Sequence, residues 1–135
     1  MAREFKLSVV APDRTVFEDN VQSVVAPGVR GYLGILADHE PVIVALKTGI
    51  LEFVDLSGNR NYVSISGGFL ESSNNSVIVL ANTAERSKEI DIARAERALE
   101  EARKALRGEA AEVTREQALE ELDRAMNRVK AARIS

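Results

Sequence analysis

The chain contains no cysteine, no tryptophan and a single histidine, His39, among its 135 residues. The absence of cysteine excludes a disulfide framework and a thiolate metal site. His39 has no nucleophile or second metal ligand near it in sequence, so a turn residue or a partner contact is a simpler interpretation than acid–base catalysis. We therefore predict no catalytic residues and no metal site.

Long apolar runs and an excess of positive charge are also missing. No apolar stretch approaches the ~18 residues that a membrane-spanning helix requires, and the first residues lack the apolar core of a signal peptide. The formal net charge of −3 does not favour non-specific binding to nucleic acid. We expect a soluble intracellular protein with no direct membrane insertion, although peripheral attachment to a membrane complex stays possible.

The last third of the chain is poor in aromatics, proline and glycine. Every aromatic residue and every proline, and every glycine except Gly108, precedes residue 85. Beyond that point alanine, leucine and charged residues dominate. Such a change of composition indicates a structural boundary. We predict a β domain over residues 1–85 and a helical hairpin over residues 86–135, which makes the fold α+β.

The pattern of residues 1–85 predicts a series of short strands. Phe5, Leu7 and Val9 alternate with polar residues, as in a half-buried strand. Turn residues separate the β-prone runs that follow, a pattern typical of an antiparallel sandwich or barrel. Gly67 and Gly68 indicate a tight bend or a close approach of two backbones. Strands are expected near residues 5–9, 15–17, 21–26, 32–36, 42–46, 50–56, 61–66, 69–71 and 77–80.

The second region has the apolar periodicity of two helices. Three large apolar residues recur every seven positions in the first helix, with alanine between them, which predicts a seam of contacts with a second helix. The second helix repeats apolar residues at intervals of three and four. The predicted seams are Ile92, Ala95, Leu99, Ala102 and Leu106 in the first helix, and Leu119, Leu122, Met126 and Val129 in the second.

Local signals also predict where these helices end. Gly108 is a plausible left-handed residue after the first helix, and Thr114 with Gln117 forms a capping box at the start of the second. The short connection predicts antiparallel neighbours. Since an alanine-rich hairpin buries little apolar area, we expect it to need a docking surface.

Antiparallel packing would gather arginines at one end of the hairpin. The start of the first helix carries Arg94 and Arg97, and the end of the second carries Arg124 and Arg128. Guanidinium groups suit bidentate recognition of phosphate. A solvated cationic face, favoured by the dipole at a helix C-terminus, is the alternative, and the spacing alone does not decide between them.

Several segments, taken in order, make the chain resemble the ε subunit of the bacterial F-type rotary ATP synthase. No single segment is decisive, but together with the β-then-hairpin layout they span the whole length. They are Val9-Val10-Ala11-Pro12-Asp13, Gly31-Tyr32-Leu33-Gly34-Ile35-Leu36 with His39 and Pro41, Ser66-Gly67-Gly68-Phe69-Leu70-Glu71, Ala84-Glu85-Arg86, Ile90-Asp91-Ile92-Ala93-Arg94-Ala95 and Arg124-Ala125-Met126-Asn127-Arg128.

The resemblance implies a non-catalytic rotor subunit in the central stalk, at the cytoplasmic face of the cell membrane. It implies that the β sandwich binds the γ subunit and the c-ring, and so couples rotation to proton flow. Tyr32 and His39 match the region near these rotor partners, although Tyr32 replaces the polar residue common there. The hairpin would fold against the sandwich, or extend toward the α/β catalytic head and block ATP hydrolysis.

The resemblance also implies a regulatory ATP site on the folded hairpin of some bacterial members. Its motif, Ile/Leu-Asp-x-x-Arg-Ala, is matched here by Ile90-Asp91 and Arg94-Ala95. We expect that the protein requires no cofactor, and no residue indicates a need for Mg²⁺. A further arginine of the family's site, within or after the first helix, has no secure counterpart here, and Arg97 and Arg103 are both candidates for it. The residues that match the ATP site are Glu85, Ile90, Asp91, Arg94, Arg124 and Arg128.

Two alternative hypotheses remain at the level of sequence. The hairpin could be a purely structural clamp of the same rotor subunit, without a nucleotide site. The chain could also be a free-standing ATP-sensing adaptor.

Overall fold

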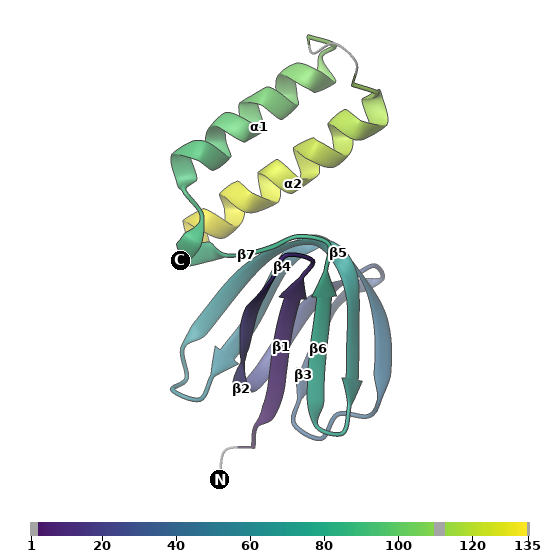
Figure 1. Ribbon diagram of the computed structural model, residues 1–135, viewed down its shortest axis with the longest axis vertical. Helices are drawn as coiled ribbons and strands as arrows, with labels where there is room; N and C mark the ends of the chain where they lie inside the picture. The colour runs from purple at the N-terminus through teal and green to yellow at the C-terminus, as the bar shows by residue number, and fades with distance from the viewer. Residues whose placement is uncertain (1–2, 110–112, 135) are drawn as a thin grey trace.

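A computed structural model describes residues 3–109 and 113–134. A β domain is followed by two antiparallel helices packed against one of its ends (Figure 1), which confirms the predicted fold class. The strands are β1 Phe5–Ala11, β2 Arg14–Gly28, β3 Gly31–Leu36, β4 Val42–Asp55, β5 Arg60–Ser73, β6 Ser76–Ala81 and β7 Ala84–Arg86, and the helical segments are the 3₁₀ turn η1 Ser87–Glu89, α1 Ile92–Leu106 and α2 Arg115–Ile134.

The sheet closes on itself. Its order is β1-β6-β5-β4-β2-β3, and β1 also pairs with β2, so the path returns to its start, while β7 adds to β5. The β1–β6 pair is parallel, whereas the predicted arrangement was antiparallel throughout. Closure buries alternate side chains in one core, which includes Leu7, Val24 and Phe53 with no exposed surface. Sheet closure also protects strand edges.

Three long strands replace six of the expected short ones. Residues 15–17 and 21–26 belong to β2, residues 42–46 and 50–56 fall largely in β4, and residues 61–66 and 69–71 belong to β5. The polar or glycine-containing interruptions look like turns in the sequence, but β2 keeps its register with β1 through its interruption, where Glu18, Asp19 and Asn20 pair with Ser8, Leu7 and Lys6. Because the neighbouring strand still pairs with these residues, β2 does not end there, and the prediction of separate strands was wrong.

At Gly68 the backbone of β5 lies very close to that of β6. The φ of Gly68 is +127°, and a Cβ atom there would lie 2.0 Å from the carbonyl oxygen of Leu80. Neighbouring Gly67 also has a positive φ, of +91°, and its carbonyl accepts a hydrogen bond from the N–H of Asn82. The predicted close approach of backbones is confirmed. After β6 the chain turns at this point and returns alongside β5 as β7.

The contact between the two helices is made largely by alanine. In α1, Ala95 and Ala102 are buried as predicted, but Ile92 is 42% exposed. In α2, Ala118, Ala125 and Val129 are buried. The predicted seam was wrong at Leu119 and Met126, which are 44% and 52% exposed. Small residues on both helices let the backbones approach closely, so the larger side chains are displaced to the flanks.

Both predicted helix ends are confirmed. Gly108 has φ +80° and donates its N–H to the carbonyl of Ala105, while Glu109 donates to the carbonyl of Lys104. These two bonds define a Schellman motif. At the start of α2, the N–H of Gln117 donates to Thr114 Oγ1 and the N–H of Thr114 donates to Gln117 Oε1, each over 3.1 Å.

The hairpin lies on the barrel through α2, which contacts β4, β5 and η1, with α1 on its far side (Figure 1). A small apolar cluster joins Ile50 of β4 to Ile90, Ala95 and Val129. The side-chain amide of Asn127 donates to the Gly49 carbonyl at 2.7 Å and to Ser64 Oγ at 3.0 Å. In this structure the hairpin, called the arm below, is therefore packed against the barrel. Within residues 3–109 and 113–134, neither helix combines the length and apolarity needed to cross a membrane.

Candidate functional site

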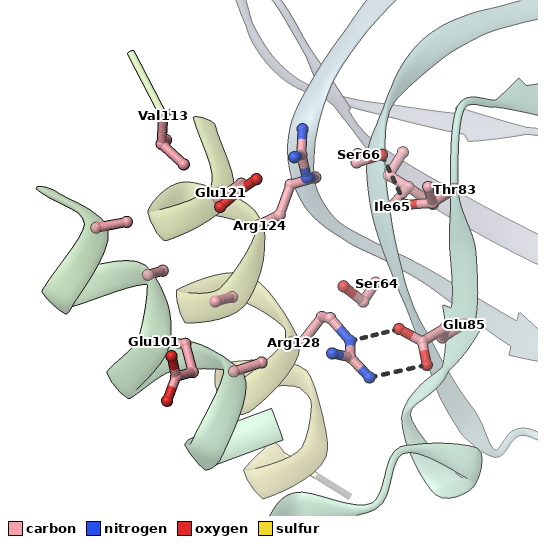
Figure 2. A pocket seen from close by; sticks show the side chains of 14 residues that line it. Ser64, Ile65, Ser66, Thr83, Glu85, Glu101, Val113, Glu121, Arg124 and Arg128 are labelled. Carbon is pink, nitrogen blue, oxygen red and sulfur yellow. Dashed lines mark hydrogen bonds and ion pairs between the residues drawn. The ribbon is translucent and has the colours of Figure 1, made fainter. Parts of the chain in front are cut away.

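A cleft of about 690 Å³ separates the hairpin from the strands (Figure 2). Pockets that bind small molecules commonly have 300–1,000 Å³. Alanines and charged side chains of both helices form one wall, and mostly polar side chains of β5, β7 and the residue before β7 form the other. The lining residues are Ser64, Ile65, Ser66, Thr83, Glu85, Ala98, Glu101, Ala102, Ala105, Val113, Glu121, Arg124, Ala125 and Arg128.

Three of the predicted site residues meet in this cleft. Arg128 Nε donates to Glu85 Oε1 at 2.6 Å, and Arg128 Nη2 donates to Glu85 Oε2 at 3.3 Å. Arg124 lies one turn earlier on α2 and projects between the helix and the strands (Figure 2). Among residues 3–109 and 113–134 no carboxylate forms an ion pair with Arg124. The cleft thus holds one paired and one uncommitted guanidinium group.

The fold fixes the positions of these groups from two directions. Glu85 is held by β7, where it pairs with Ser64 of β5. Arg128 follows Asn127, whose amide is anchored to Gly49 and Ser64. The backbone ladder and the Asn127 anchor therefore set Glu85 opposite Arg128 across the interface between arm and barrel.

Ile90 and Asp91 have structural contacts of their own. Ile90, at 9% exposure, packs in the apolar cluster beneath the hairpin and does not line the cleft. Asp91 is the N-cap of α1, and its Oδ1 accepts the N–H of Arg94 at 3.2 Å. An N-cap carboxylate typically stabilises a helix by ~1 kcal/mol. The structure thus gives both residues a role in starting α1.

Arg94 is exposed and does not line the cleft. However, Arg94 precedes the lining residue Ala98 by four residues. Helical periodicity therefore places it on the same face of α1, one turn closer to the N-terminus of the helix. Arg97 precedes Glu101, another lining residue, by the same interval. Arg103 instead lines a separate groove with Leu99 and Met126. Of the two candidate arginines of the first helix, Arg97 therefore lies nearer the cleft face.

Tyr32 and His39 lie at opposite ends of β3. The Tyr32 hydroxyl accepts the N–H of Ile50 at 3.3 Å, next to the docking site of Asn127. His39 is exposed, in a loop whose Asp38 N–H bonds to Asn75 Oδ1 where β6 begins. The end of the barrel that carries His39 and the start of β6 faces away from the helices (Figure 1). The two predicted rotor contacts are not brought together.

Sequence reasoning missed Asn127 as an anchor and the polar wall formed by Ser64, Ser66 and Thr83. Asparagine is a weak helix former. Its position in the middle of the second helix was therefore the one available indication that Asn127 has a specific contact. The serines and threonine gave no signal, because strands commonly carry them on exposed faces. In the part of the chain that is described, no group of three or more histidine, aspartate or glutamate side chains could hold a metal ion.

Comparisons with known proteins cover nearly the whole chain. Residues 4–87 match the family model described as ATP synthase, Delta/Epsilon chain, beta-sandwich domain, and residues 88–133 match the long alpha-helix domain of the same chain. The ATP synthase epsilon chain of Desulforamulus reducens is 42% identical over 132 residues, which cover 98% of this chain and 99% of that one. That of Carboxydothermus hydrogenoformans is 52% identical over 106 residues, 78% of each chain.

A solved structure supports the same relationship. A chain in the cryo-EM structure of the Euglena gracilis mitochondrial ATP synthase, containing OSCP, F1 and the c-ring, superposes with a TM-score of 0.79. It is 28% identical in sequence, and the match covers 98% of this chain and 82% of that one.

Proposed function

The chain belongs to the ATP synthase delta/epsilon family, and on this basis we propose that it is a non-catalytic central-stalk subunit of an F-type ATP synthase. Its β domain would bind the γ subunit and the c-ring at the cytoplasmic face of the cell membrane. Its hairpin would act as a movable arm, which when extended toward the α/β head blocks ATP hydrolysis. Family membership argues against the alternative of a free-standing adaptor.

The observation that carries the regulatory part is the cleft itself. Its walls come from both helices and from β5 and β7, so a ligand inside it contacts the arm and the barrel together. Such a ligand binds the folded arm better than an extended one, and a ligand shifts a conformational equilibrium by that difference in affinity. Arg124 and Arg128 supply cations for an anionic ligand, and Arg94 lies one helical turn before the lining residue Ala98. Glu101 and Glu121 line the same cleft. We propose ATP as this ligand.

Calorimetric titration of the full chain with ATP, with and without Mg²⁺, tests this proposal. Arg124→Ala should weaken ATP binding roughly 10- to 150-fold, which corresponds to the ~1.5–3 kcal/mol of a hydrogen bond to a charged group. Arg115→Ala is the matched control, because Arg115 begins α2 and does not line the cleft. Equal ATP affinity of the Arg124→Ala variant and the unchanged chain would refute the site.

The inhibitory role has a separate test in the assembled enzyme. Removing the hairpin should raise the ATP hydrolysis rate of the synthase complex if the arm blocks rotation. A complex with the truncated chain that hydrolyses ATP at the original rate would exclude an inhibitory arm.

One observation favours the alternative of a structural hairpin without a nucleotide site. Glu85 already neutralises Arg128, and the ion pair by itself links arm and barrel. Absence of binding at millimolar ATP would support this alternative, and it would leave the assignment as a stalk subunit unchanged.

A further inference from the structure

The loop between β3 and β4, residues 37–41, belongs to the barrel end that faces away from the helices (Figure 1). Its residues from Asp38 to Pro41 are exposed. Large apolar side chains are exposed on both sides of it, with Leu36 at the end of β3 65% exposed and Ile43 near the start of β4 73% exposed. Exposed apolar groups rimmed by polar residues have the composition of a surface that binds a partner.

Asp38 has an unusual backbone conformation within this loop. Its φ is +60°, in the left-handed region that residues other than glycine seldom adopt. Such a conformation persists where surrounding contacts impose it, and such positions concentrate at functional sites. Two contacts hold Asp38 here. Its N–H donates to Asn75 Oδ1 at 2.7 Å, and its carboxylate pairs with Arg3.

The Asn75 side chain joins three segments that are distant in the chain. Asn75 itself lies in the two-residue turn between β5 and β6, where Ser73 pairs with Ser76. Its Oδ1 accepts from the Asp38 N–H, and its Nδ2 donates to the carbonyl of Glu4, just before β1, at 2.9 Å. An amide carries a donor and an acceptor in fixed geometry, so this one side chain ties the loop to the start of β1.

The turn between β5 and β6 does not by itself require the Asn75 side chain. Asn74 and Asn75 have φ values of +50° and +55°, and positive φ at both central residues is the requirement of a type I′ hairpin turn, which glycine also meets. Within residues 3–109 and 113–134, the Asn74 side chain makes no hydrogen bond to another residue. The two positions therefore share a conformation and differ in their side-chain contacts.

We propose that Asn75 is a positioning residue for partner binding by the barrel. Its amide holds residues 37–41, including the exposed His39, in the conformation that docks to the c-ring. In the proposed function the arm extends toward the α/β head, so the opposite end of the barrel faces the c-ring. A loop that is already in its bound conformation binds more tightly, because no fraction of the chains must first rearrange. The c-ring part rests on the proposed function, whereas the hold on the loop does not.

The hold on the loop is tested by hydrogen exchange of the Asp38 N–H in the full chain, followed by NMR. Asn75→Gly should accelerate this exchange about tenfold, because the amide loses its acceptor while the turn keeps its positive φ. The amides of the buried pair Leu70 and Val79 should not change, since the barrel stays folded. Asn74→Gly is the matched control and should leave Asp38 exchange unchanged. Equal Asp38 exchange in the Asn75→Gly variant and the unchanged chain would overturn the positioning role.

Partner binding is tested by the association of the full chain with an immobilised assembly of γ and the c-ring. Asn75→Gly should weaken this association roughly five- to tenfold, because fewer chains present the competent loop. Asn74→Gly should bind as the unchanged chain does. If Asn75→Gly accelerates Asp38 exchange and still binds with unchanged affinity, the loop does not contribute to docking and the c-ring part is refuted.

These measurements also separate the positioning role from the proposed function. If the unchanged chain does not associate with γ and the c-ring, the assignment as a stalk subunit falls, and the c-ring role of Asn75 falls with it. Asp38 exchange then still decides whether Asn75 holds the loop. If the unchanged chain associates and the two asparagine variants behave alike, only the role of Asn75 is refuted.

Discussion

Individual backbone positions determine how this barrel bends. Gly68 is the clearest case, because both its positive φ and the contact with Leu80 exclude a side chain. Gly34, in β3, has open space around its missing Cβ and no positive φ. The two glycines therefore differ in what they contribute, although both belong to strands.

Gly68→Ala should lower the free energy of unfolding by at least ~2 kcal/mol, because backbone strain and a backbone clash act together. Chemical denaturation followed by circular dichroism measures the change. Gly34→Ala is the control and should stay within about 0.5 kcal/mol of the unchanged chain. If both substitutions had the same small effect, the described approach of β5 to β6 would be wrong.

At the scale of elements, the hairpin has two different apolar surfaces. Ala95, Ala102, Ala118 and Ala125 are buried in the two packed helices. Ile92, Leu119 and Met126 remain largely exposed in the folded arm. The helix-to-helix contact depends on small side chains rather than on burial of large ones, so enlarging an alanine is more harmful than shortening a leucine.

Ala118→Leu should destabilise the hairpin by ~1–3 kcal/mol, because Ala118 has no exposed surface and the added atoms overpack the contact. Leu119→Ala, at the next position, should change stability by no more than ~0.5 kcal/mol. Hydrogen–deuterium exchange of α1 and α2 amides compares the two variants. The reverse order of effects would restore the leucine seam that the sequence suggested.

At the scale of the whole molecule, the barrel and the arm have unequal cores. The main core consists of strand residues such as Leu7, Phe53 and Leu70. The second cluster is small and mixes Ile50 of the barrel with Ile90 and Val129. The barrel therefore does not depend on the arm for its core, whereas the arm depends on the barrel for docking.

A chain cut after Glu89, which retains β7 and η1, should keep a folded barrel. Circular dichroism should show loss of the helical signal, and thermal unfolding should stay cooperative, because the main core is intact. The corresponding peptide of the hairpin alone should be only marginally helical. A truncated chain that fails to unfold cooperatively would show that the arm is part of the barrel's stability.

Local signals in the chain correctly predicted the features that depend on neighbouring residues. The change of composition placed strands before helices, and Gly108 with the Thr114–Gln117 capping box set the ends of the two helices. These signals are local, because a cap or a left-handed turn involves residues within one turn of each other. The gathering of Arg124 and Arg128 on one side of α2 also follows from helical spacing alone.

Features that depend on residues distant in the chain became visible only in the folded protein. Pairing with neighbouring strands joined the predicted short strands, as where β1 pairs with Glu18, Asp19 and Asn20 of β2 without a break. Close packing of the two helices buries their alanine-rich faces and leaves Leu119 exposed. The partner of Arg128 was decided in the same way, since Glu85 lies 43 residues earlier. Only the β7–β5 pairing and the docked α2 bring that carboxylate to the guanidinium.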